Sequence, residues 1–323
     1  MSVTVAVALG VAGLAVLVAG ARFAFHGRPL RVKLLGVPLV LAVVQWVVLP
    51  AAGALLATVS VRHPVERAAT LGLPGARDVV FPASDGVRLA GWWVPGRNGA
   101  AVVVGHGSHG DRSDTLAHLR MLTAAGYAVL AYDARGHGRS AGRTNALGWD
   151  GAADVAGAVA LARRRPGIAA GRIAMLGLSM GAEEALRAAA GGVPLCAIVA
   201  DGAGASTTGD RAVVETGTLA PVAASTSWVT NRLIEGLTGA REPVALKDVV
   251  GRIRAPVLLV ASSRAGERRY DAALRGRIGA RAALWSVADA RHTRALERHP
   301  REYAQRVLRL LGTAIGATRP AAD

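Results

Sequence analysis

The segment Gly177-Leu178-Ser179-Met180-Gly181 most constrains how this chain can fold. It follows a predicted strand, Arg172 to Leu176, and precedes an alanine-rich predicted helix, Ala182 to Ala190. A strand that turns directly into a helix needs small residues on both sides of the turn, which pushes the central side chain into the open. The helix N-terminus adds a positive dipole where negative charge can develop. We therefore predict that Ser179 is a nucleophile.

The rest of the chain supports this prediction, which matters because such a segment arises easily by chance among 40 glycines. After Pro64, short apolar runs alternate with helix-like stretches, a pattern typical of an α/β fold with a mostly parallel central sheet flanked by helices. We expect an opening antiparallel pair at Asp78 to Pro82 and Val87 to Pro95. The expected parallel strands are Ala101 to Gly105, Tyr127 to Tyr132, Arg172 to Gly177, Leu195 to Ala200, Pro256 to Ala261 and Ala282 to Val287. The expected helices are Ser113 to Ala125, Trp149 to Arg165, Gly181 to Ala190 and Arg301 to Leu311.

Two further features occupy the positions that a nucleophilic serine needs. Val104-Gly105-His106-Gly107-Ser108 ends an early strand, where the Ser108 N–H can form an oxyanion hole with the N–H of Met180. His292 follows the last predicted strand, which is the position of a general base. The order along the chain therefore predicts a serine and a histidine acting together.

These residues, together with the stretch Tyr132-Asp133-Ala134-Arg135-Gly136-His137-Gly138-Arg139-Ser140, carry a family resemblance. From about residue 76 to 312 the chain resembles the α/β-hydrolase superfamily, particularly its Bem46-like and dienelactone-hydrolase-like esterases and peptidases. The resemblance implies the α/β-hydrolase fold and hydrolysis of an ester, thioester or peptide bond without a cofactor, but it does not select a substrate. It also implies that His106, His137 and Asp133 shape loops near the site.

The carboxylate that orients the base is where the sequence departs from the common pattern. Relatives place an aspartate shortly after the strand that corresponds to Pro256 to Ala261, whereas this chain has Ser262-Ser263-Arg264-Ala265-Gly266-Glu267. Glu267 could serve, because the triad needs only a carboxylate that reaches the distal imidazole nitrogen. Asp201 follows the preceding strand directly, a position that some superfamily members use. We favour Asp201 slightly, because a strand end fixes a short carboxylate better than a loop fixes a long one. Asp289 is a third candidate.

The first sixty residues hold most of the apolar excess of a chain that is 52% hydrophobic. Val3 to Ala21 and Leu34 to Val59 are each long enough to cross a hydrocarbon core of about 30 Å. We predict two transmembrane helices within residues 1–63, followed by a hydrolase domain over 64–323. A cleaved signal peptide is the alternative for the first run, but the chain has no positively charged segment before it.

The orientation in the membrane follows from four basic residues between the two runs, Arg22, Arg28, Arg31 and Lys33. The positive-inside rule holds this loop in the cytoplasm and places the catalytic domain outside.

The segment of residues 203–250, between two predicted strands, is longer than a simple crossover requires. It forms either a small cap over the site, with Trp228, Leu233 and Ile234 on an apolar face, or packing helices with no substrate role.

Charge and composition exclude several partners. The net charge of +16 comes almost wholly from scattered arginines, without a basic stripe or nucleic-acid motif, so we expect contact with lipid headgroups and no nucleic acid. Neither a metal-ligand cluster nor a phosphate loop occurs, and the lone Cys196 reads as a core residue. Two functions remain: a membrane-anchored serine hydrolase acting on a small acyl or peptide substrate, and an inactive hydrolase-fold binding module. Neither the oligomeric state nor the substrate follows from the sequence.

Overall fold

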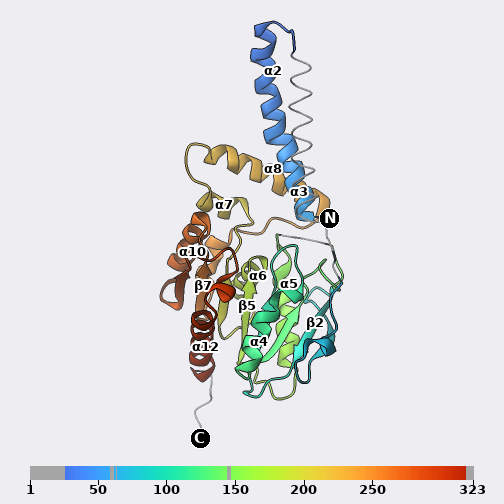
Figure 1. Ribbon diagram of the computed structural model, residues 1–323, viewed down its shortest axis with the longest axis vertical. Coiled ribbons are helices and arrows are strands. Elements are labelled where there is room, and N and C mark those ends of the chain that lie inside the picture. The colour runs from blue at the N-terminus through green and yellow to red at the C-terminus, as the bar shows by residue number, and fades with distance from the viewer. Residues whose placement is uncertain (1–25, 59–61, 63, 144–146, 318–323) are drawn as a thin grey trace.

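The computed structural model describes residues 26–58, 62, 64–143 and 147–317, and this part of the chain contains one eight-stranded sheet (Figure 1). The strand order is β1-β2-β4-β3-β5-β6-β7-β8. The pairs β1–β2 and β2–β4 are antiparallel, and the remaining pairs are parallel. The strands are β1 (Arg77–Pro82), β2 (Arg88–Val94), β3 (Ala101–Gly105), β4 (Ala128–Tyr132), β5 (Ile173–Leu178), β6 (Ile198–Asp201), β7 (Val257–Ala261) and β8 (Ala282–Ser286). The predicted strands are all present, with small shifts at their ends.

Helices cover both faces of this sheet. Outside the segment between β6 and β7, the helices that follow β3 are α4 (Leu116–Ala124), α5 (Gly151–Arg163), α6 (Met180–Ala190), α10 (Ala265–Ile278), α11 (Ala295–Arg298) and α12 (Pro300–Ala317). Between β6 and β7 lie α7 (Thr208–Val214), α8 (Ala220–Thr238) and α9 (Leu246–Val249). Short 3-10 turns are η2 (Ala68–Leu71), η3 (Arg112–Thr115), η4 (Val250–Arg252) and η5 (Gly279–Arg281). The four helices predicted from the sequence are present, whereas α10 was not predicted.

Two hydrophobic layers hold these helices to the sheet. The core on one face joins the sheet to α5, α6 and α10, through side chains such as Val155, Leu186 and Leu274. The core on the other face joins it to α4 and α12, through side chains such as Leu119 and Val307. The parallel strands are apolar along their length because both of their faces are covered. Their carboxyl ends meet at one edge of the sheet, where the predicted site residues lie.

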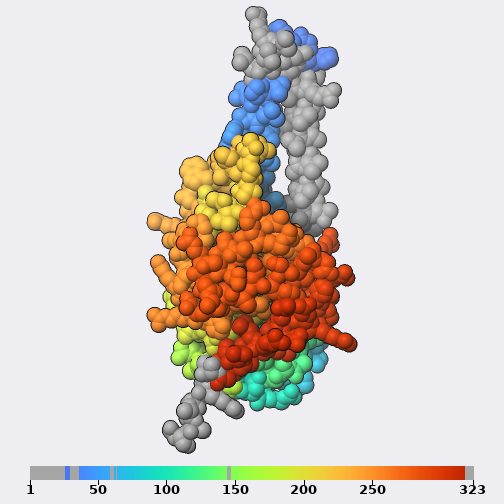
Figure 2. Space-filling view, turned by 90° about the vertical axis from the view of Figure 1, so that its left-hand side faces the viewer, coloured from blue at the N-terminus to red at the C-terminus, as the bar shows by residue number. Residues whose placement is uncertain are grey.

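The N-terminal part of the described chain is one continuous helix formed by α2 (Leu30–Val43), the π turn η1 (Val44–Val48) and α3 (Leu49–Thr58). The π turn precedes Pro50, which has no N–H to donate to the carbonyl four residues earlier and whose ring clashes with that carbonyl. Residues Gly36–Thr58 form the one helix in the described chain that is long and apolar enough to cross a membrane, and only 11% of its most apolar window is buried. The helix projects beyond the globular body (Figure 2). The predicted second span is therefore helical, while Val3 to Ala21 lies outside the described residues.

The segment between β6 and β7 folds as helices, of which α8 lies against α3 (Figure 1). Ile234 is buried in a small cluster with Ala54 of α3 and with Trp149. Trp228 and Leu233 are instead 54% and 38% exposed. The expectation that these three α8 residues share one apolar face was therefore wrong: Ile234 packs inward and the other two point outward.

Candidate active site

Ser179 lies at the turn between β5 and α6, in a backbone conformation that few serines adopt. Its φ is 52°, in the left-handed region, and its N–H donates to the Asp201 carbonyl over 2.8 Å. A Cβ atom at Gly177 would stand 2.1 Å from the Gly181 carbonyl oxygen, so β5 and α6 can approach this closely because residue 177 is a glycine. A Cβ atom at Gly181 would stand 2.7 Å from the Gly105 carbonyl carbon, so this glycine lets the helix approach β3. The two glycines thus permit the turn that presents the serine hydroxyl.

The structure brings Ser179, His292 and Glu267 into one hydrogen-bonded chain. His292 Nε2 lies 2.9 Å from the Ser179 hydroxyl oxygen, and His292 Nδ1 lies 2.7 Å from Glu267 Oε2. With the carboxylate accepting from Nδ1–H, Nε2 is left to accept the serine proton, which is the tautomer that a general base requires.

Glu267 is held from three directions. Its Oε1 accepts from the Ser262 N–H over 2.6 Å, while its Oε2 accepts from the Ser262 hydroxyl over 2.9 Å in addition to His292. Burial alone would raise the pKa of Glu267, but the hydrogen bonds from His292 and Ser262 outweigh it and the pKa is lowered. Glu267 is therefore ionised where it faces the imidazole.

Asp201, the acid that we favoured from the sequence, does not orient His292. Its backbone carbonyl accepts from Ser179, but its carboxyl is buried, with Oδ2 lacking a hydrogen-bond partner among the described residues. Burial raises the pKa of Asp201 to about 7, against the opposing influence of Tyr303. Our preference failed because Glu267 does not lie in a loop: it belongs to the first turn of α10, which fixes the longer side chain.

Asp289 is also excluded as the partner of His292. It is exposed and pairs with Arg298 and His299, each over 2.7 Å. These contacts lower its pKa and turn the carboxylate away from the site. The structure therefore places one of the three candidate acids on the imidazole.

The predicted oxyanion-hole residues both lie beside Ser179. A Cβ atom at Gly107 would stand 3.4 Å from the Ser179 Cβ, so the loop from Gly107 to Ser108 passes directly over the serine. Ser108 and Met180 line a cavity of about 190 Å³ that includes Ser179. Their position makes the two N–H groups available to an oxyanion, and this role stays a prediction.

His106, His137 and Asp133 hold the surrounding loops, as expected. The His106 Nε2 accepts from the Ala134 N–H over 2.9 Å, while Nδ1 lies 2.7 Å from the Gly107 carbonyl. Burial lowers the pKa of both histidines, that of His137 to about 4, so both rings are neutral. Asp133 forms a buried ion pair with Arg112, with 2.6 Å between the charged atoms.

Two residues near the site escaped sequence reasoning. Ser262 gives both of its donors to Glu267, and Gly202 supports the imidazole, since a Cβ there would stand 2.8 Å from His292 Cε1. Gly202 also has a φ of +67°, which favours glycine. A serine directly after a strand and a glycine directly after Asp201 were the available signals, but neither is specific.

Ser179 lies where two cavities meet. The cavity of about 190 Å³ opens towards α7, through Ser206 and Arg211. A larger one of about 560 Å³ opens on the other side and is lined by His292 and by charged side chains that include Arg264, Arg294 and Glu297. A substrate bound at Ser179 can therefore extend in two chemically different directions.

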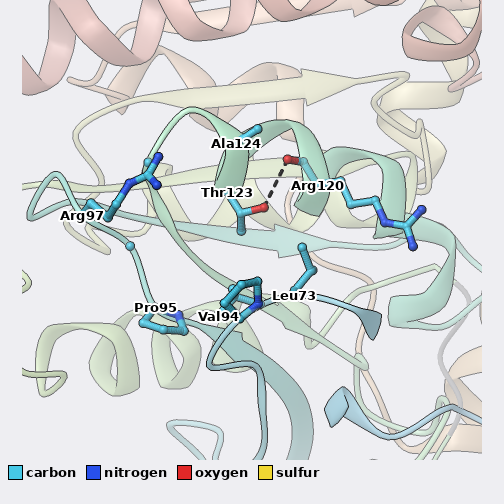
Figure 3. A pocket seen from close by; sticks show the side chains of 10 residues that line it. Leu73, Val94, Pro95, Arg97, Arg120, Thr123 and Ala124 are labelled. Atoms are coloured by element: carbon cyan, nitrogen blue, oxygen red, sulfur yellow. Dashed lines mark hydrogen bonds between the residues drawn. The ribbon is translucent and has the colours of Figure 1, made fainter. Parts of the chain in front are cut away.

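A third cavity, of about 420 Å³, lies away from this site. It is lined by Leu73, Val94 and Pro95 and bordered by Arg97 and Arg120, which extend to opposite sides of it (Figure 3). It lies near Gly126, before β4 begins, and so at the opposite edge of the sheet from Ser179.

Within the described residues no group of three or more His, Cys, Asp or Glu side chains is arranged to hold a metal ion.

Known structures share this fold. An esterase of Pyrococcus furiosus superposes with a TM-score of 0.63 at 23% identity, covering 79% of this chain and 98% of the esterase. An α/β hydrolase from Penicillium, GrgF, gives a TM-score of 0.59 at 19% identity, covering 75% of this chain and 99% of that protein. These likenesses establish an α/β-hydrolase fold, with its sheet mostly parallel.

Sequence comparison gives the family. Residues 75–307 match the sequence model of the X-Pro dipeptidyl-peptidase (S15) family, and the chain belongs to that family. This membership confirms the prediction of an α/β-hydrolase enzyme of the esterase or peptidase type.

The chain is also similar to curated proteins that are uncharacterized. An uncharacterized protein of Mycobacterium tuberculosis is 39% identical over 126 residues, which is 38% of this chain and 44% of that protein. The uncharacterized protein YfhR of Escherichia coli is 28% identical over 167 residues, which is 50% of this chain and 52% of YfhR. The chain thus spans about half the length of the curated relatives it matches.

Proposed function

We propose that the protein is a serine hydrolase that forms an acyl-enzyme on Ser179. The observation that supports this most is the continuous hydrogen-bonded chain from Ser179 through His292 to Glu267, with separations of 2.9 and 2.7 Å. The substrate bond is an ester, a thioester or a peptide. The narrower resemblance to Bem46-like and dienelactone-hydrolase-like enzymes stays a prediction.

The reaction proceeds in two halves. His292 Nε2 takes the Ser179 proton as the oxygen attacks the acyl carbon, and the Ser108 and Met180 N–H groups bind the resulting oxyanion. The bond to the leaving group breaks as His292 returns the proton to it. Water then attacks the acyl-enzyme, giving a proton to His292, which passes it back to the serine as the acid departs. Glu267 holds the imidazole and stabilises its charged form, without changing protonation.

The best evidence for the alternative, an inactive hydrolase fold that serves as a binding module, was the displaced acid of the triad. The bond from Glu267 to His292 removes that argument. No other feature of the described residues favours the alternative.

Substitution of the nucleophile tests the function. The Ser179→Ala variant should lose covalent labelling by a fluorophosphonate and lower ester turnover by several orders of magnitude, because no other group can form the acyl-enzyme. Ser263→Ala, which removes a nearby exposed hydroxyl, is the matched control and should leave both unchanged. Undiminished turnover by the Ser179→Ala protein would overturn the assignment.

We further propose that the helix Gly36–Thr58 anchors the enzyme in the membrane. Its length of 23 residues and its exposed apolar surface support this. The basic residues that precede it, including Arg28, Arg31 and Lys33, favour a cytoplasmic loop on that side, so the hydrolase domain lies outside. Two spans and this orientation remain predictions.

A further inference from the structure

A cavity of about 360 Å³ separates the apolar N-terminal helix from α8. Gly53 and Ala57 line it from α3, while Ala223 and Ile234 line it from α8. Polar and charged side chains also line it, namely Gln45, Thr226, Ser227, Thr230, Asn231, Arg211 and Glu215. The two helices are joined above and below it: Gln45 Nε2 donates to Thr226 Oγ1 over 2.5 Å, and Gly53 lies close against Thr230. The helix that we propose to anchor the protein thus forms one wall of an internal space.

This cavity adjoins the cavity at Ser179. Leu147 and Arg211 line it, and the same two residues line the cavity of about 190 Å³ that contains Ser179, Ser108 and Met180. The side chains of Leu147 and Arg211 therefore stand between the two cavities. A chain-like group that enters between α3 and α8 and passes this pair of side chains would reach the serine and the predicted oxyanion hole.

If Gly36–Thr58 spans the membrane as proposed, the entrance between α3 and α8 lies within its length. Trp46 donates to Ser225 over 2.8 Å, and it lies twelve residues before Thr58, or about 18 Å along a helix that rises about 1.5 Å per residue. Polar pairs of this kind are the contacts that membrane-embedded helices use. Residues 220–231 of α8 carry no charge, and the first charges follow at Arg232 and Glu235. The uncharged part of α8 is therefore compatible with the lipid environment that we propose for the anchor helix.

The outer surface of α8 fits the same environment. Leu219 is 74% exposed, Trp228 54% and Leu237 56%. Exposed leucine and tryptophan on a helix beside a membrane span suit the boundary between headgroups and acyl chains.

The opposite side of Ser179 is polar. The cavity of about 560 Å³ there is lined by Arg264, Arg294 and Glu297, and it is reached without passing the anchor helix. A substrate with a long apolar acyl chain and a polar alcohol therefore matches both directions that lead away from the serine.

We propose that the enzyme hydrolyses lipid esters drawn from the bilayer, with the acyl chain entering between α3 and α8 and the alcohol leaving through the polar cavity. This inference rests on the proposed serine hydrolase function. The ester C–O bond breaks, the acyl carbon bonds to Ser179 Oγ, and the alcohol leaves with the proton from His292; water then releases the fatty acid.

The test compares two esters with the same leaving group on the full-length protein in phosphatidylcholine vesicles. Methylumbelliferyl acetate is soluble and needs no apolar channel, whereas methylumbelliferyl palmitate partitions into the vesicle. Ala57→Trp and Ala223→Trp place a large side chain in the cavity between the helices. Ala51→Trp, on the exposed side of the same α3, is the matched control.

We expect both cavity variants to lose about tenfold or more in palmitate hydrolysis, because an indole occupies the acyl path, while acetate hydrolysis stays within about twofold of wild type. Ala51→Trp should change neither rate. Palmitate turnover that is unaffected in both cavity variants, or that falls only in parallel with acetate turnover, would overturn the proposed entry path. A wild-type protein that cleaves acetate but not palmitate would refute the lipid substrate alone, whereas one that cleaves neither ester and resists fluorophosphonate would refute the hydrolase function itself.

Discussion

Replacing Glu267 by glutamine should disable the active site while keeping its shape. The carboxylate accepts three hydrogen bonds, from the Ser262 N–H, the Ser262 hydroxyl and His292 Nδ1. A glutamine has one acceptor oxygen, so it must turn an NH₂ group either towards the Ser262 N–H or towards His292. In the second case Nδ1 has to become the acceptor, which places the ring proton on Nε2, where the serine proton has to go.

The expected loss can be estimated from the geometry. Two unit charges 2.7 Å apart interact by about 6 kcal/mol at an effective dielectric constant of about 20. The Glu267 side chain is 6% exposed and that of His292 27%, so solvent screens this pair only in part. If the interaction with the imidazolium is lost in the transition state, the rate falls by up to about 10⁴-fold. The wrong tautomer costs about as much in serine proteases. We expect a loss in kcat of about 10³-fold to 10⁴-fold.

The assay is single-turnover acylation by a soluble aryl ester, with thermal unfolding as the check on folding. The matched control is Asp201→Asn, which neutralises the other candidate carboxyl. Because the pKa of Asp201 is raised to about 7, its neutral form is already well populated near neutrality, and asparagine imitates that form. This variant should stay within about threefold of wild type. Equal losses in both variants, or full activity of Glu267→Gln, would refute the assignment.

Three further outcomes are expected. First, burial raises the pKa of Asp201 from about 4 in the unfolded chain to about 7 in the folded protein. Between these pH values the folded protein keeps a proton that the unfolded chain has released, so the free energy of unfolding falls as the pH rises from about 4 to about 7. The free energy of unfolding in urea should therefore be up to about 4 kcal/mol higher for Asp201→Asn than for wild type above about pH 8, and the same for both proteins below about pH 4. A difference that does not depend on pH would contradict this. Second, Gly202→Ala should lower kcat/KM for a soluble ester by about 100-fold, because its Cβ would stand 2.8 Å from the imidazole; an unchanged rate would show that the ring can move at no cost. Third, the full-length protein should stay in the membrane fraction after alkaline and high-salt washing, since an apolar span is not held by screened charge. Protease added to intact cells should digest the hydrolase domain, and complete protection alongside a digested control would reverse the proposed orientation.

The strands and the serine turn could be predicted because their signals are local. Runs such as Val102 to Val104 are apolar on both sheet faces, and glycines on each side of Ser179 mark the turn. The position of His292 beside Ser179 could be predicted because it lies in the loop that follows the last strand.

The acid could not be chosen from the sequence because the helix that carries it was not recognised. Its buried side chains include Tyr270, Leu274 and Ile278, which are four residues apart, but arginines surround them and its mean hydropathy is low. With Glu267 placed in a loop after the strand Pro256 to Ala261, the shorter Asp201 at a strand end was the preferred acid. The prediction that Trp228, Leu233 and Ile234 share one face of α8 was wrong for a related reason. Nothing in the sequence of α8 indicates that Ile234 packs against Ala54 of α3, which is distant in the sequence.

The chain of hydrogen bonds at Ser179 also sets an order of assembly. The turn around the serine closes between residues a few positions apart, whereas His292 reaches it across 113 residues of sequence and Glu267 reaches His292 across 25. Closing a long loop is the slow and entropically costly event. We therefore expect the serine turn to form before the segment that carries Glu267 and His292 has docked. Under the proposed function, reactivity towards a fluorophosphonate would then report the docking of this last segment.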